Sequence, residues 1–532
     1  MAVSEDPLAT AIGLEVLQRG GNAVDAAVTM GFVMAVTHPQ AGNIGGGGFM
    51  LFYEAGTEKV SAVDYREKAP VRAHRDLFLD SGGNANRELS RFSHLAAGVP
   101  GTVAGLALAL HEFGTISLEE AVRPAAKLAR EGFIVSHALS RDIKASADLL
   151  YRWPSTRAVF FKRDDTFYEY GDRLVQRDLA CTLDGIAENG PAGFYEGKVA
   201  DAIADQMEKH GGIISRDDLA QYEAVIREPV RGTYRGFEIY SMPPPSSGGV
   251  HLIQLLNILE GYDVRKSGHQ SAATIHLMAE AMKRAYADRS EYLGDPGFFP
   301  VPLRGLTSKK YADQLRQEID LHHARPAQEI GPGIPLAKES DQTTHFVVVD
   351  RAGNAVSNTY TLNFSFGSGI MVDGAGFLLN NEMDDFSSKP GVPNAYGLIG
   401  GAANAIEPGK RMLSSMSPSI VAKDGAPFLV TGSPGGSRII TTTLQVILNV
   451  VDHGMTVEEA VAAPRIHHQW LPDELRVEEG ISADVLQTLQ EMGHNVVTGE
   501  KMGAASTIKI DGAGNVFSGA VDPRRGGLAA GY

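Results

Sequence analysis

Three polar stretches of the sequence carry side chains that could do chemistry. The first, Gln342-Thr343-Thr344-His345, brings hydroxyl groups to the junction between a charged segment and an apolar run. The second, 380–386, holds three carboxylates within four residues, and the third is a pair of Ser- and Gly-rich stretches at 413–418 and 432–438. Taken alone, the first stretch is typical of a strand start, the second of a solvated or cation-binding acidic loop, and the third of turns.

Other catalytic classes leave no local signature in the sequence. We find no GxSxG, HExxH or Walker A motif, and no GxGxxG that opens a helix after a strand. The adjacent pairs His322-His323 and His467-His468 point in different directions, so we interpret them as solvated or structural. The single cysteine, Cys181, excludes an internal disulfide, a Cys-ligated zinc site and a CxxC pair, and we expect it to be packed as an apolar residue. The sequence therefore predicts no metal and no cofactor.

The elements that must position these side chains follow from periodicity and turn residues. Apolar spacing and capping residues predict helices at 7–19, 22–36, 102–112, 117–131, 179–189, 198–210, 271–288 and 438–452. Runs of β-branched and aromatic residues predict strands at 49–53, 60–65, 343–350, 355–361, 419–422, 427–431, 505–510 and 516–520. Hairpins and helices come in blocks, which favours an α+β fold with helices packed over antiparallel sheets. We expect residues 321–341 to form a surface linker and Gly45 to Gly48 to allow tight packing.

Composition narrows the class of protein. The chain has 532 residues, is 43% hydrophobic, and carries 48 Lys and Arg against 64 Asp and Glu, a net charge of −16. This composition predicts a globular protein, and its acidity disfavours binding to nucleic acid. The longest apolar run, 26–37, is shorter than the roughly 18 residues of a membrane span, so we expect a buried helix and no membrane span. The N-terminal residues lack the pattern of an export signal, so we expect that a signal either never existed or has been removed.

Taken together, motifs along essentially the whole chain resemble those of the γ-glutamyltransferases (γ-glutamyl transpeptidases, glutathione hydrolases) of bacterial type, within the N-terminal nucleophile hydrolase superfamily. The matching motifs are Thr37-His-Pro-Gln-Ala-Gly-Asn-Ile-Gly-Gly-Gly-Gly-Phe-Met50, Asp64-Tyr-Arg-Glu-Lys-Ala-Pro70, Pro243-Pro-Pro-Ser-Ser-Gly-Gly249, Thr343-Thr-His345, Thr359-Tyr-Thr-Leu-Asn363, the 380–386 segment, Leu413-Ser-Ser-Met-Ser-Pro418, Gly432-Ser-Pro-Gly-Gly-Ser437 and Ala530-Gly-Tyr532. Their order along the chain makes the set far more specific than any one motif.

The resemblance implies a four-layer αββα sandwich and a precursor that cuts itself between Gln342 and Thr343. Residues 1–342 would form a large subunit and residues 343–532 a small catalytic one, paired as a heterodimer. Thr343 would be the nucleophile, and its freed α-amino group, with an ordinary pKa of roughly 7.7–8.0, would be the base. The enzyme would transfer the γ-glutamyl group of glutathione and related compounds to water, amino acids or dipeptides. Bacterial members are usually periplasmic or secreted.

The resemblance also assigns the remaining site residues. Thr361 would orient the nucleophile, and the backbone N–H groups of Gly435 and Gly436 would stabilise the oxyanion. The α-amino acid head of the substrate would be held by Arg66, Ser414 and Ser415 at the carboxylate, and by Asn363, Glu382 and Asp385 at the ammonium. Position 382 varies between Gln and Glu in the family. Tyr396, in a Pro- and Gly-rich segment, would close a lid over the pocket by bonding Asn363.

Two alternatives remain open on the sequence. A cephalosporin (glutaryl) acylase on the same scaffold would share Thr343 and the oxyanion glycines but relax the amino-group site. A binding protein that never matures is the other, and the intact Thr343 argues against it. A substrate with a free α-amino acid head is favoured by the residues retained here, namely Arg66, Asn363, Glu382, Asp385, Ser414 and Ser415.

Overall fold

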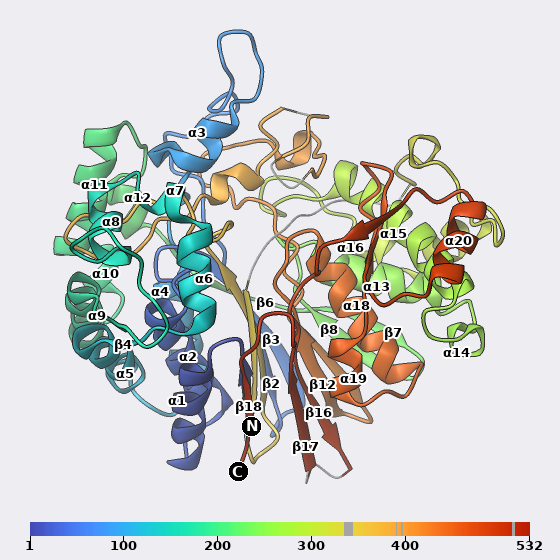
Figure 1. Cartoon of the computed structure of the whole chain (residues 1–532), viewed down its shortest axis with the longest axis horizontal. Helices are drawn as coiled ribbons and strands as arrows, with labels where there is room; N and C mark the ends of the chain where they lie inside the picture. The colour runs from blue at the N-terminus through green and yellow to red at the C-terminus, as the bar shows by residue number, and fades with distance from the viewer. Residues whose placement is uncertain (335–343, 390, 395–396, 513–515) are drawn as a thin grey trace.

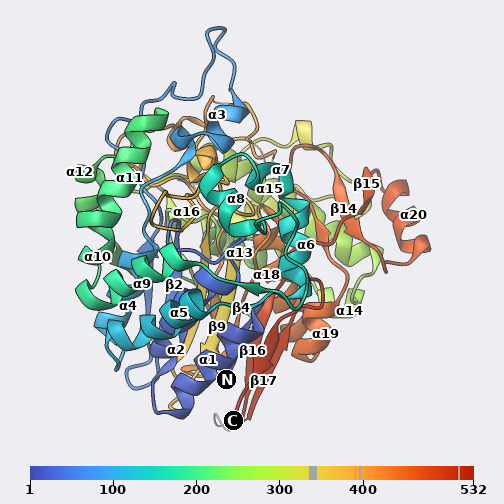
Figure 2. The same ribbon diagram turned by 60° about the vertical axis from the view of Figure 1, so that its left-hand side comes forward.

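The computed structural model describes residues 1–334, 344–389, 391–394, 397–512 and 516–532. Two large antiparallel sheets stand face to face in the middle of the molecule, with helices on both outer sides (Figure 1). This arrangement is the four-layer αββα sandwich that the sequence resemblance implies. Figure 2, turned by 60°, shows the helical layer of the N-terminal part in front of the sheets.

The first sheet mixes strands from both ends and the middle of the chain. In spatial order it consists of β18 (Leu528–Ala530), β1 (Ala2–Ser4), β9 (Thr344–Val349), β10 (Ala355–Thr361), β2 (Gly47–Glu54), β3 (Lys59–Tyr65) and β6 (Val225–Arg227). The strand that follows the proposed cleavage point, β9, therefore lies between β1 and β10. Its register pairs Thr344 with Tyr360 and Val348 with both Val356 and Ala2.

The second sheet has the same mixed origin. In order it consists of β17 (Val516–Val521), β16 (Ser506–Asp511), β12 (Ala426–Gly432), β11 (Ser419–Lys423), β8 (Phe237–Ser241) and β7 (Val230–Tyr234). Two small sheets lie outside the sandwich: β13 (Ile466–His467) with β14 (Leu475–Glu478) and β15 (Val496–Gly499), and β4 (Phe133–Ile134) with β5 (Arg173–Leu174). Only the β14–β15 pair is parallel among the described strand pairs.

Alternation of side chains explains why the two sheets stack. In β2, Phe49 and Leu51 belong to a core between the sheets, whereas Met50 and Phe52 pack against the first helical layer. Successive side chains of a strand point to opposite faces, so an uninterrupted apolar strand must be covered on both sides. The predicted strand 49–53 is such a run, and both it and the more polar strand 355–361 are buried in the structure.

Helices cover the outer face of each sheet. On the first side lie α1 (Pro7–Gln18), α2 (Ala23–Thr37), α3 (Arg87–Phe92), α4 (Thr102–Phe113), α5 (Leu118–Glu131), α6 (His137–Ala145), α7 (Ala147–Leu150), α8 (Pro154–Phe160), α9 (Arg177–Asn189), α10 (Ala192–Tyr195), α11 (Gly197–His210) and α12 (Arg216–Ala220). On the second side lie α13 (Gly248–Leu259), α14 (Val264–Ser267), α15 (Ala272–Tyr292), α16 (Leu303–Leu306), α17 (Lys309–Gln317), α18 (Arg438–Val451), α19 (Val457–Ala462) and α20 (Ala483–Glu491). Among the described helices, none combines the length and the apolar character needed to cross a bilayer.

Helix α2 shows how local sequence sets an element. Asn22 caps its N-terminus by accepting from the N–H groups of Val24 and Asp25, and the Asp25 carboxylate accepts from the Asn22 N–H in return. This reciprocal capping box satisfies N–H groups that the helix itself leaves without partners. Every residue of α2 is buried, which confirms the prediction of a buried helix at 26–37.

One sequence expectation is wrong, and another is refined by the structure. Cys181 is exposed rather than packed, because it lies on the solvent side of α9 while Leu179, Leu183 and Ile186 form the buried side. The described part of the expected surface linker, 321–334, is mostly exposed, as expected, but hydrogen bonds hold it against the second helical layer. Trp470 donates its indole N–H to the carbonyls of Ala327 and Ile330 at 2.8 Å, and the Gly333 N–H donates to Asp288 at 2.8 Å.

Candidate active site

Arg66 lies directly after β3 and is completely buried. Its guanidinium donates to Glu382 Oε1 at 2.5 Å and to Asp385 Oδ2 at 2.6 Å, and Glu67 Oε2 lies 3.5 Å away. The carbonyls of Met412 and Leu413 accept from the same group at 3.2 and 3.3 Å. The structure thus joins three predicted binding residues, Arg66, Glu382 and Asp385, from segments more than 300 positions apart.

The backbone around Arg66 is held in place by further side chains. The Arg66 N–H donates to Asp64 Oδ1 at 3.0 Å, and Asp64 is paired with Arg227 at 2.7 Å. The Tyr222 hydroxyl donates to the Arg66 carbonyl at 2.8 Å. A rigid backbone of this kind fixes where the guanidinium points, which a site for planar carboxylate recognition requires.

Carboxyl groups outnumber cationic groups in this cluster. Glu67, Glu382 and Asp385 share the Arg66 guanidinium, and all four side chains are at most 1% exposed. Burial raises the pKa of Glu382 and of Asp385 well above the ordinary range of a carboxyl, although Arg66 opposes the shift. Burial disfavours the charged form of Arg66, but the carboxylates outweigh it and raise the pKa of Arg66. A further cation placed beside Glu382 and Asp385 would lower these raised pKa values and favour the ionised carboxylates.

Two carboxylate oxygens in the cluster have no hydrogen-bond partner among the described residues. They are Glu382 Oε2 and Asp385 Oδ1, and both are shielded from solvent. A buried polar atom without a partner costs free energy, which makes such an atom a candidate ligand-binding position. Both oxygens are acceptors, so the group that would satisfy them is a donor.

The 380–386 segment is linked to the end of β10. The Asn363 side chain donates to the Asn381 carbonyl at 2.8 Å, and the Asn381 N–H donates to the Leu362 carbonyl at 3.1 Å. The Asn363 N–H donates to Thr361 Oγ1 at 2.7 Å. The predicted residues Thr361 and Asn363 therefore lie together, one peptide step from the Arg66 cluster.

Ser414 and Ser415 are buried beside the same cluster, in the segment whose Met412 and Leu413 carbonyls bind Arg66. The Pro243 to Gly249 motif supports this segment: the Ser247 N–H donates to the Ser414 carbonyl at 2.7 Å, and the Ser414 N–H donates to the Pro245 carbonyl at 3.0 Å. Ser247 Oγ also donates to Ser415 Oγ at 3.2 Å. The two motifs, separate in sequence, build one wall.

Gly435 and Gly436 form the turn between β12 and α18. Both have positive φ angles, 128° and 70°, which favour glycine. No described acceptor takes a hydrogen bond from either N–H group. Two free amides at the start of a 14-residue helix point partial positive charge toward an anion, which suits an oxyanion site.

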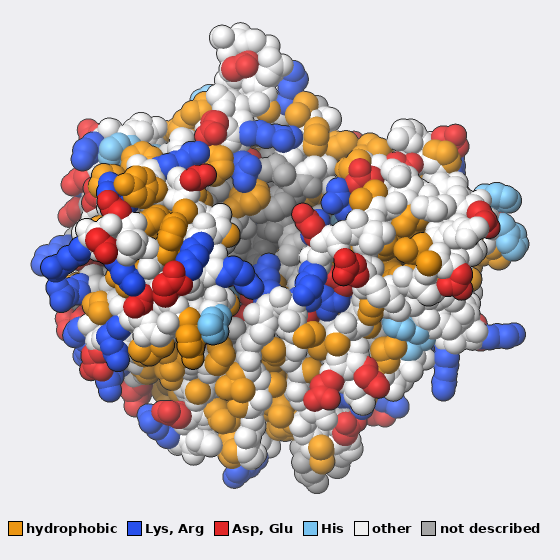
Figure 3. Space-filling view, viewed as in Figure 1, with side chains coloured by type: hydrophobic (Ala, Val, Ile, Leu, Met, Phe, Trp, Pro, Cys, Tyr) orange, Lys and Arg blue, Asp and Glu red, His pale blue; other side chains and the backbone are white. Residues whose placement is uncertain are grey.

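Two of the predicted catalytic residues, Thr361 and Gly435, line a cavity of about 550 Å³. Thr361, Asn363 and Gly435 form one wall, and the start of α1, the end of α2, α6 and residues 525–527 form the others. Figure 3 shows a hollow in the middle of this face of the molecule, with Lys and Arg side chains around its rim. The volume lies within the range of small-molecule sites.

Two predicted site residues, Thr343 and Tyr396, lie outside the described residues. In β10, Tyr360 pairs with Thr344, and Thr361 is the next residue. Because β9 and β10 are antiparallel, Thr361 lies on the side of this pair that faces the proposed cleavage point. His345, also in β9, is fully buried, and its Nδ1 lies 2.9 Å from Thr359 Oγ1. Burial lowers the pKa of His345 to about 3, so it stays neutral and serves packing.

One group of possible metal ligands occurs in the described part of the chain. Ligand atoms of His276, Glu280 and His494 lie within 4.8 Å of one another. However, Glu280 is already paired with Lys283 and Arg284, and His276 Nε2 meets the Asp320 carbonyl at 2.7 Å. These contacts attach the docked segment to α15, so we assign the group to structure.

Sequence reasoning gave no role to two residues that the structure places in this site. Glu67 lies against Arg66, and its position inside the Asp64-Tyr-Arg-Glu motif was the available signal. Asn43 donates to the Thr361 carbonyl at 2.8 Å and accepts from the Gly46 N–H at 2.9 Å. In the sequence, Asn43 could have been noticed as a lone polar side chain shortly before four glycines.

The αββα layers, with a strand that begins beside the proposed cleavage point and a pocket at its end, define an N-terminal nucleophile hydrolase. Comparison with known families is more specific: the gamma-glutamyltranspeptidase model matches residues 9–532, and the chain belongs to this family. It is accordingly an enzyme.

Relatives and solved structures agree with this assignment. The glutathione hydrolase proenzyme of Escherichia coli (strain K12) is 55% identical over 534 residues, covering 100% of this chain and 92% of its own length. The crystal structure of cephalosporin acylase from Bacillus halodurans matches 100% of this chain and 95% of that chain, with a TM-score of 0.89 and 28% identity. The crystal structure of Helicobacter pylori gamma-glutamyltranspeptidase matches 63% of this chain and 95% of that chain, with a TM-score of 0.62 and 47% identity.

Proposed function

We propose that the chain is a γ-glutamyltransferase and glutathione hydrolase. It cleaves the γ-glutamyl amide bond of glutathione and related compounds and passes the γ-glutamyl group to water, amino acids or dipeptides. One observation carries the proposal: the Arg66 guanidinium lies 2.5 and 2.6 Å from the Glu382 and Asp385 carboxylates, each of which keeps one unpartnered buried oxygen.

This arrangement is complementary to the head of an α-amino acid. A carboxylate and an ammonium group on the same carbon need a cation and an anion side by side when they are buried. Arg66, with Ser414 and Ser415, would bind the carboxylate, while Glu382, Asp385 and Asn363 would take the ammonium. Both carboxyls must then be ionised, and the incoming ammonium lowers their pKa because opposite charge favours the charged form.

Maturation would produce the nucleophile. Thr343 Oγ attacks the Gln342 carbonyl, the acyl group moves from nitrogen to oxygen, and water hydrolyses the resulting ester. Thr343 then carries a hydroxyl and a free α-amine, which serves as the general base. The large subunit would comprise residues 1–342 and the small subunit residues 343–532, and the proenzyme name of the Escherichia coli relative supports this step.

Catalysis would then proceed through a γ-glutamyl ester. Thr343 Oγ attacks the γ-carbonyl carbon, the amine leaves with a proton from the α-ammonium of Thr343, and water or an acceptor amine resolves the ester. The N–H groups of Gly435 and Gly436 would stabilise the tetrahedral oxyanion, and loss of one such donor typically costs about 3–4 kcal/mol. Thr361 would orient the nucleophile, and Tyr396 would close the lid through Asn363. We also infer export to the periplasm or medium, the usual location of bacterial family members.

The decisive experiment combines N-terminal sequencing with turnover of a γ-glutamyl anilide by the same preparation. We expect two chains, the second beginning Thr-Thr-His-Phe, and release of the aniline. Thr343→Ala should give one uncut, inactive chain, while Thr57→Ala, in an exposed turn, should behave like the wild type. Turnover by a chain whose 342–343 bond is intact would overturn the proposed nucleophile.

The alternative function is that of a glutaryl acylase, and the structural similarity to cephalosporin acylase is the observation that favours it. A glutaryl group lacks the α-amine, so it offers no donor to the free oxygens of Glu382 and Asp385. We expect Asp385→Asn to lower kcat/KM for γ-glutamyl anilide by about 10–100-fold and to spare glutaryl anilide. Asp178→Asn, in the exposed first turn of α9, is the control. Equal losses on both substrates would indicate misfolding, and a wild-type preference for glutaryl anilide would establish the acylase.

A further inference from the structure

The proposed reaction point divides the substrate into two halves. Arg66 and Glu382 bind the γ-glutamyl half and do not line the 550 Å³ cavity, whereas Thr361, Asn363 and Gly435 do. Asn363 touches both regions, through Asn381 on one side and as part of the cavity wall on the other. The half of the substrate that carries the amine, either leaving group or acceptor, must therefore extend into the cavity.

The far wall of the cavity contains buried polar groups with unused hydrogen-bonding capacity. Glu5, His38 and Gln40 line it and are 7%, 9% and 8% exposed. Glu5 Oε1, His38 Nε2 and Gln40 Oε1 have no hydrogen-bond partner in the described part of the chain. His38 Nδ1 lies 3.0 Å from the Gln40 amide nitrogen, which fixes Nε2 as the protonated, donating nitrogen of the neutral ring.

The wall thus offers two acceptors, Glu5 Oε1 and Gln40 Oε1, and one donor, His38 Nε2, which lies 3.6 Å from Glu5 Oε2. The N–H and C=O of a peptide group would satisfy one of the acceptors and the donor. Burial lowers the pKa of His38 to about 3, so the ring remains neutral at working pH. An apolar amine such as an aniline has no groups for these positions. Three such groups on one wall indicate a peptide-like ligand.

Arg525 adds a cation at the mouth of the same cavity. Its side chain is 45% exposed, and its contact with a carboxylate in the described structure is a long one, 3.5 Å from Nη1 to Glu5 Oε2. The neighbouring Arg524 is anchored inward by Glu478, Val461 and Ala463 at 2.8–2.9 Å. The chain around Arg525 is therefore fixed, while most of its guanidinium stays available.

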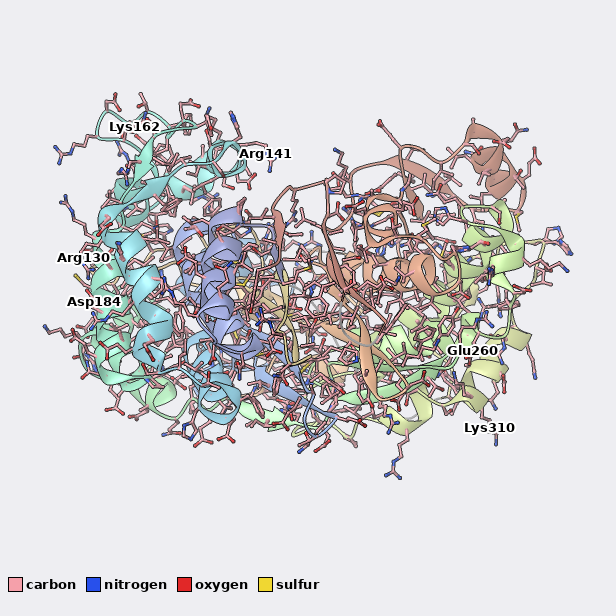
Figure 4. All side chains as sticks on the ribbon, turned by 90° about the horizontal axis from the view of Figure 1, so that it is seen from below. Arg130, Arg141, Lys162, Asp184, Glu260 and Lys310 are labelled. Carbon is pink, nitrogen blue, oxygen red and sulfur yellow. The ribbon has the colours of Figure 1, made fainter. Side chains whose placement is uncertain are left out.

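The turn after Arg525 keeps it close to Glu5. Gly526 and Gly527 have φ angles of 81° and 134°, and a Cβ on Gly527 would lie 2.2 Å from the Ser4 carbonyl oxygen. Ser4 pairs with Leu528 in the first sheet, so the strand ends hold the two segments together. A second arginine, Arg141, lies on α6 at the edge facing the gap between the two halves of the molecule (Figure 4), but it is paired with Asp142 at 3.0 Å.

We propose that Arg525 binds the free carboxylate of the amine-bearing half, the C-terminal carboxylate of a leaving or accepting dipeptide, while Glu5, His38 and Gln40 bind its peptide group. A dipeptide spans about 7 Å, at roughly 3.3–3.6 Å per residue, and one cavity is lined by Thr361 and Gly435 as well as by Arg525. This inference rests on the proposed γ-glutamyl transfer and adds which acceptors that site selects.

The test compares two acceptors that differ only at the carboxylate, glycylglycine and glycylglycinamide, with γ-glutamyl-p-nitroanilide as the donor. We expect the wild type to use glycylglycine with a kcat/KM about tenfold higher, since a charge-assisted hydrogen bond is lost in the amide. Arg525→Ala should bring the two values together, and Arg525→Lys should retain part of the preference. Arg19→Ala, an exposed arginine with a single carboxylate partner outside the cavity, should keep the wild-type ratio.

The outcomes separate the two proposals. Absence of nitroaniline release by the mature wild type would refute the γ-glutamyl chemistry itself. Nitroaniline release with equal kcat/KM for the two acceptors would overturn the carboxylate subsite alone. The same holds if Arg525→Ala leaves the ratio of the two kcat/KM values unchanged, or if only Arg141→Ala abolishes the preference. If Arg525→Ala does not mature, the wild-type ratio must still fall as salt is raised, because exposed ion pairs are screened; a ratio independent of salt contradicts the proposal.

Discussion

At the scale of single residues, Arg66 is the residue to which we assign recognition of the substrate head, and three buried carboxyl groups share its guanidinium. Removing it altogether would leave those carboxylates uncompensated, and breaking a buried pair typically costs about 3–5 kcal/mol. Arg66→Ala would therefore confuse loss of binding with loss of stability. The informative change is one that keeps the positive charge but removes the planar guanidinium group, which can make two parallel hydrogen bonds.

We predict that Arg66→Lys raises the KM for γ-glutamyl anilide by about 10–100-fold, because a lysine cannot make bidentate contacts to a carboxylate. Steady-state kinetics on the processed enzyme measures this. Arg476→Lys, a half-exposed arginine paired only with Glu474 in the described structure, should leave KM unchanged. An unchanged KM in Arg66→Lys would remove Arg66 from the substrate pocket.

Glu67 makes stability depend on pH. Burial raises its pKa from 4.5 to about 7, with Arg66 opposing the shift. Between these pH values the unfolded chain ionises Glu67 while the folded protein keeps it protonated, so stability falls as pH rises through this window. Glu67→Gln imitates the protonated form and should escape this loss.

We therefore predict that Glu67→Gln gains thermal stability relative to the wild type between pH 5 and pH 8, by roughly 2–4 °C in apparent Tm for each kcal/mol. Paired melting curves at the two pH values measure the difference. Glu208→Gln, exposed on α11, should shift both curves equally. A constant difference between Glu67→Gln and the wild type would show that Glu67 is ionised throughout.

At the scale of elements, the glycines before β2 determine how closely the site can assemble. A Cβ on Gly46 would lie 1.9 Å from the Thr361 carbonyl oxygen, and one on Gly45 would lie 2.1 Å from that of Leu378. Contacts this short force the backbone apart, since the obstructing atoms belong to main chain and cannot rotate away. The expectation that these glycines allow tight packing is confirmed.

We predict that Gly46→Ala displaces the end of β10 and lowers both the yield of processed enzyme and its kcat, with a loss of stability above about 2 kcal/mol. Gly56→Ala is the matched control, because nothing lies within 4 Å of its would-be Cβ. Gel analysis of processing and thermal melts distinguish the two variants. Normal processing and activity in Gly46→Ala would show that β2 can shift without disturbing Thr361.

Some of the elements could be predicted from the sequence and others could not. Helix α2 was predictable because its capping residues and apolar pattern are local, and strand β10 because its β-branched and aromatic residues follow a turn. The docking of residues 321–334 was not, because its anchors, Trp470 and Asp288, are remote in sequence and only the fold brings them near. The exposure of Cys181 was predictable in principle, since it falls between the buried positions of α9.

The candidate site also has a part that the sequence could predict and a part that it could not. Its residues could be named from motifs that resemble a known family, but the contact of Arg66 with Glu382 and Asp385 joins positions 316 and 319 residues apart. No local pattern encodes such a contact. Arg525 carried no motif at all, and only the cavity that it lines draws attention to it.

At the scale of the whole molecule, both sheets are built from the two proposed subunits. In the first sheet, β9 and β10 of the proposed small subunit lie between β1 and β2 of the large subunit. In the second sheet, β11 of the small subunit pairs with β8 of the large subunit. Cleavage at 342–343 would therefore leave two chains that share hydrogen-bonded ladders and cores. Their association relies on burial that neither chain can achieve alone.

We predict that the processed enzyme, unfolded in urea and diluted, regains little activity, while uncut Thr343→Ala refolds to a native-like state. Joining two separate chains costs association entropy that the uncut chain avoids. Circular dichroism and size-exclusion chromatography after dilution measure recovery. Equal recovery of both proteins, independent of concentration, would contradict the prediction.

The pairing of β1 with β18 has a practical consequence. Ala2 lies opposite Ala530, and the N- and C-termini lie side by side in Figure 1. A short linker could therefore join residue 532 to residue 1, and the chain could be opened ahead of residue 343 instead. Such a circular permutant would be translated with the attacking threonine near its beginning, so that removal of a leader residue, rather than self-cleavage, would switch it on.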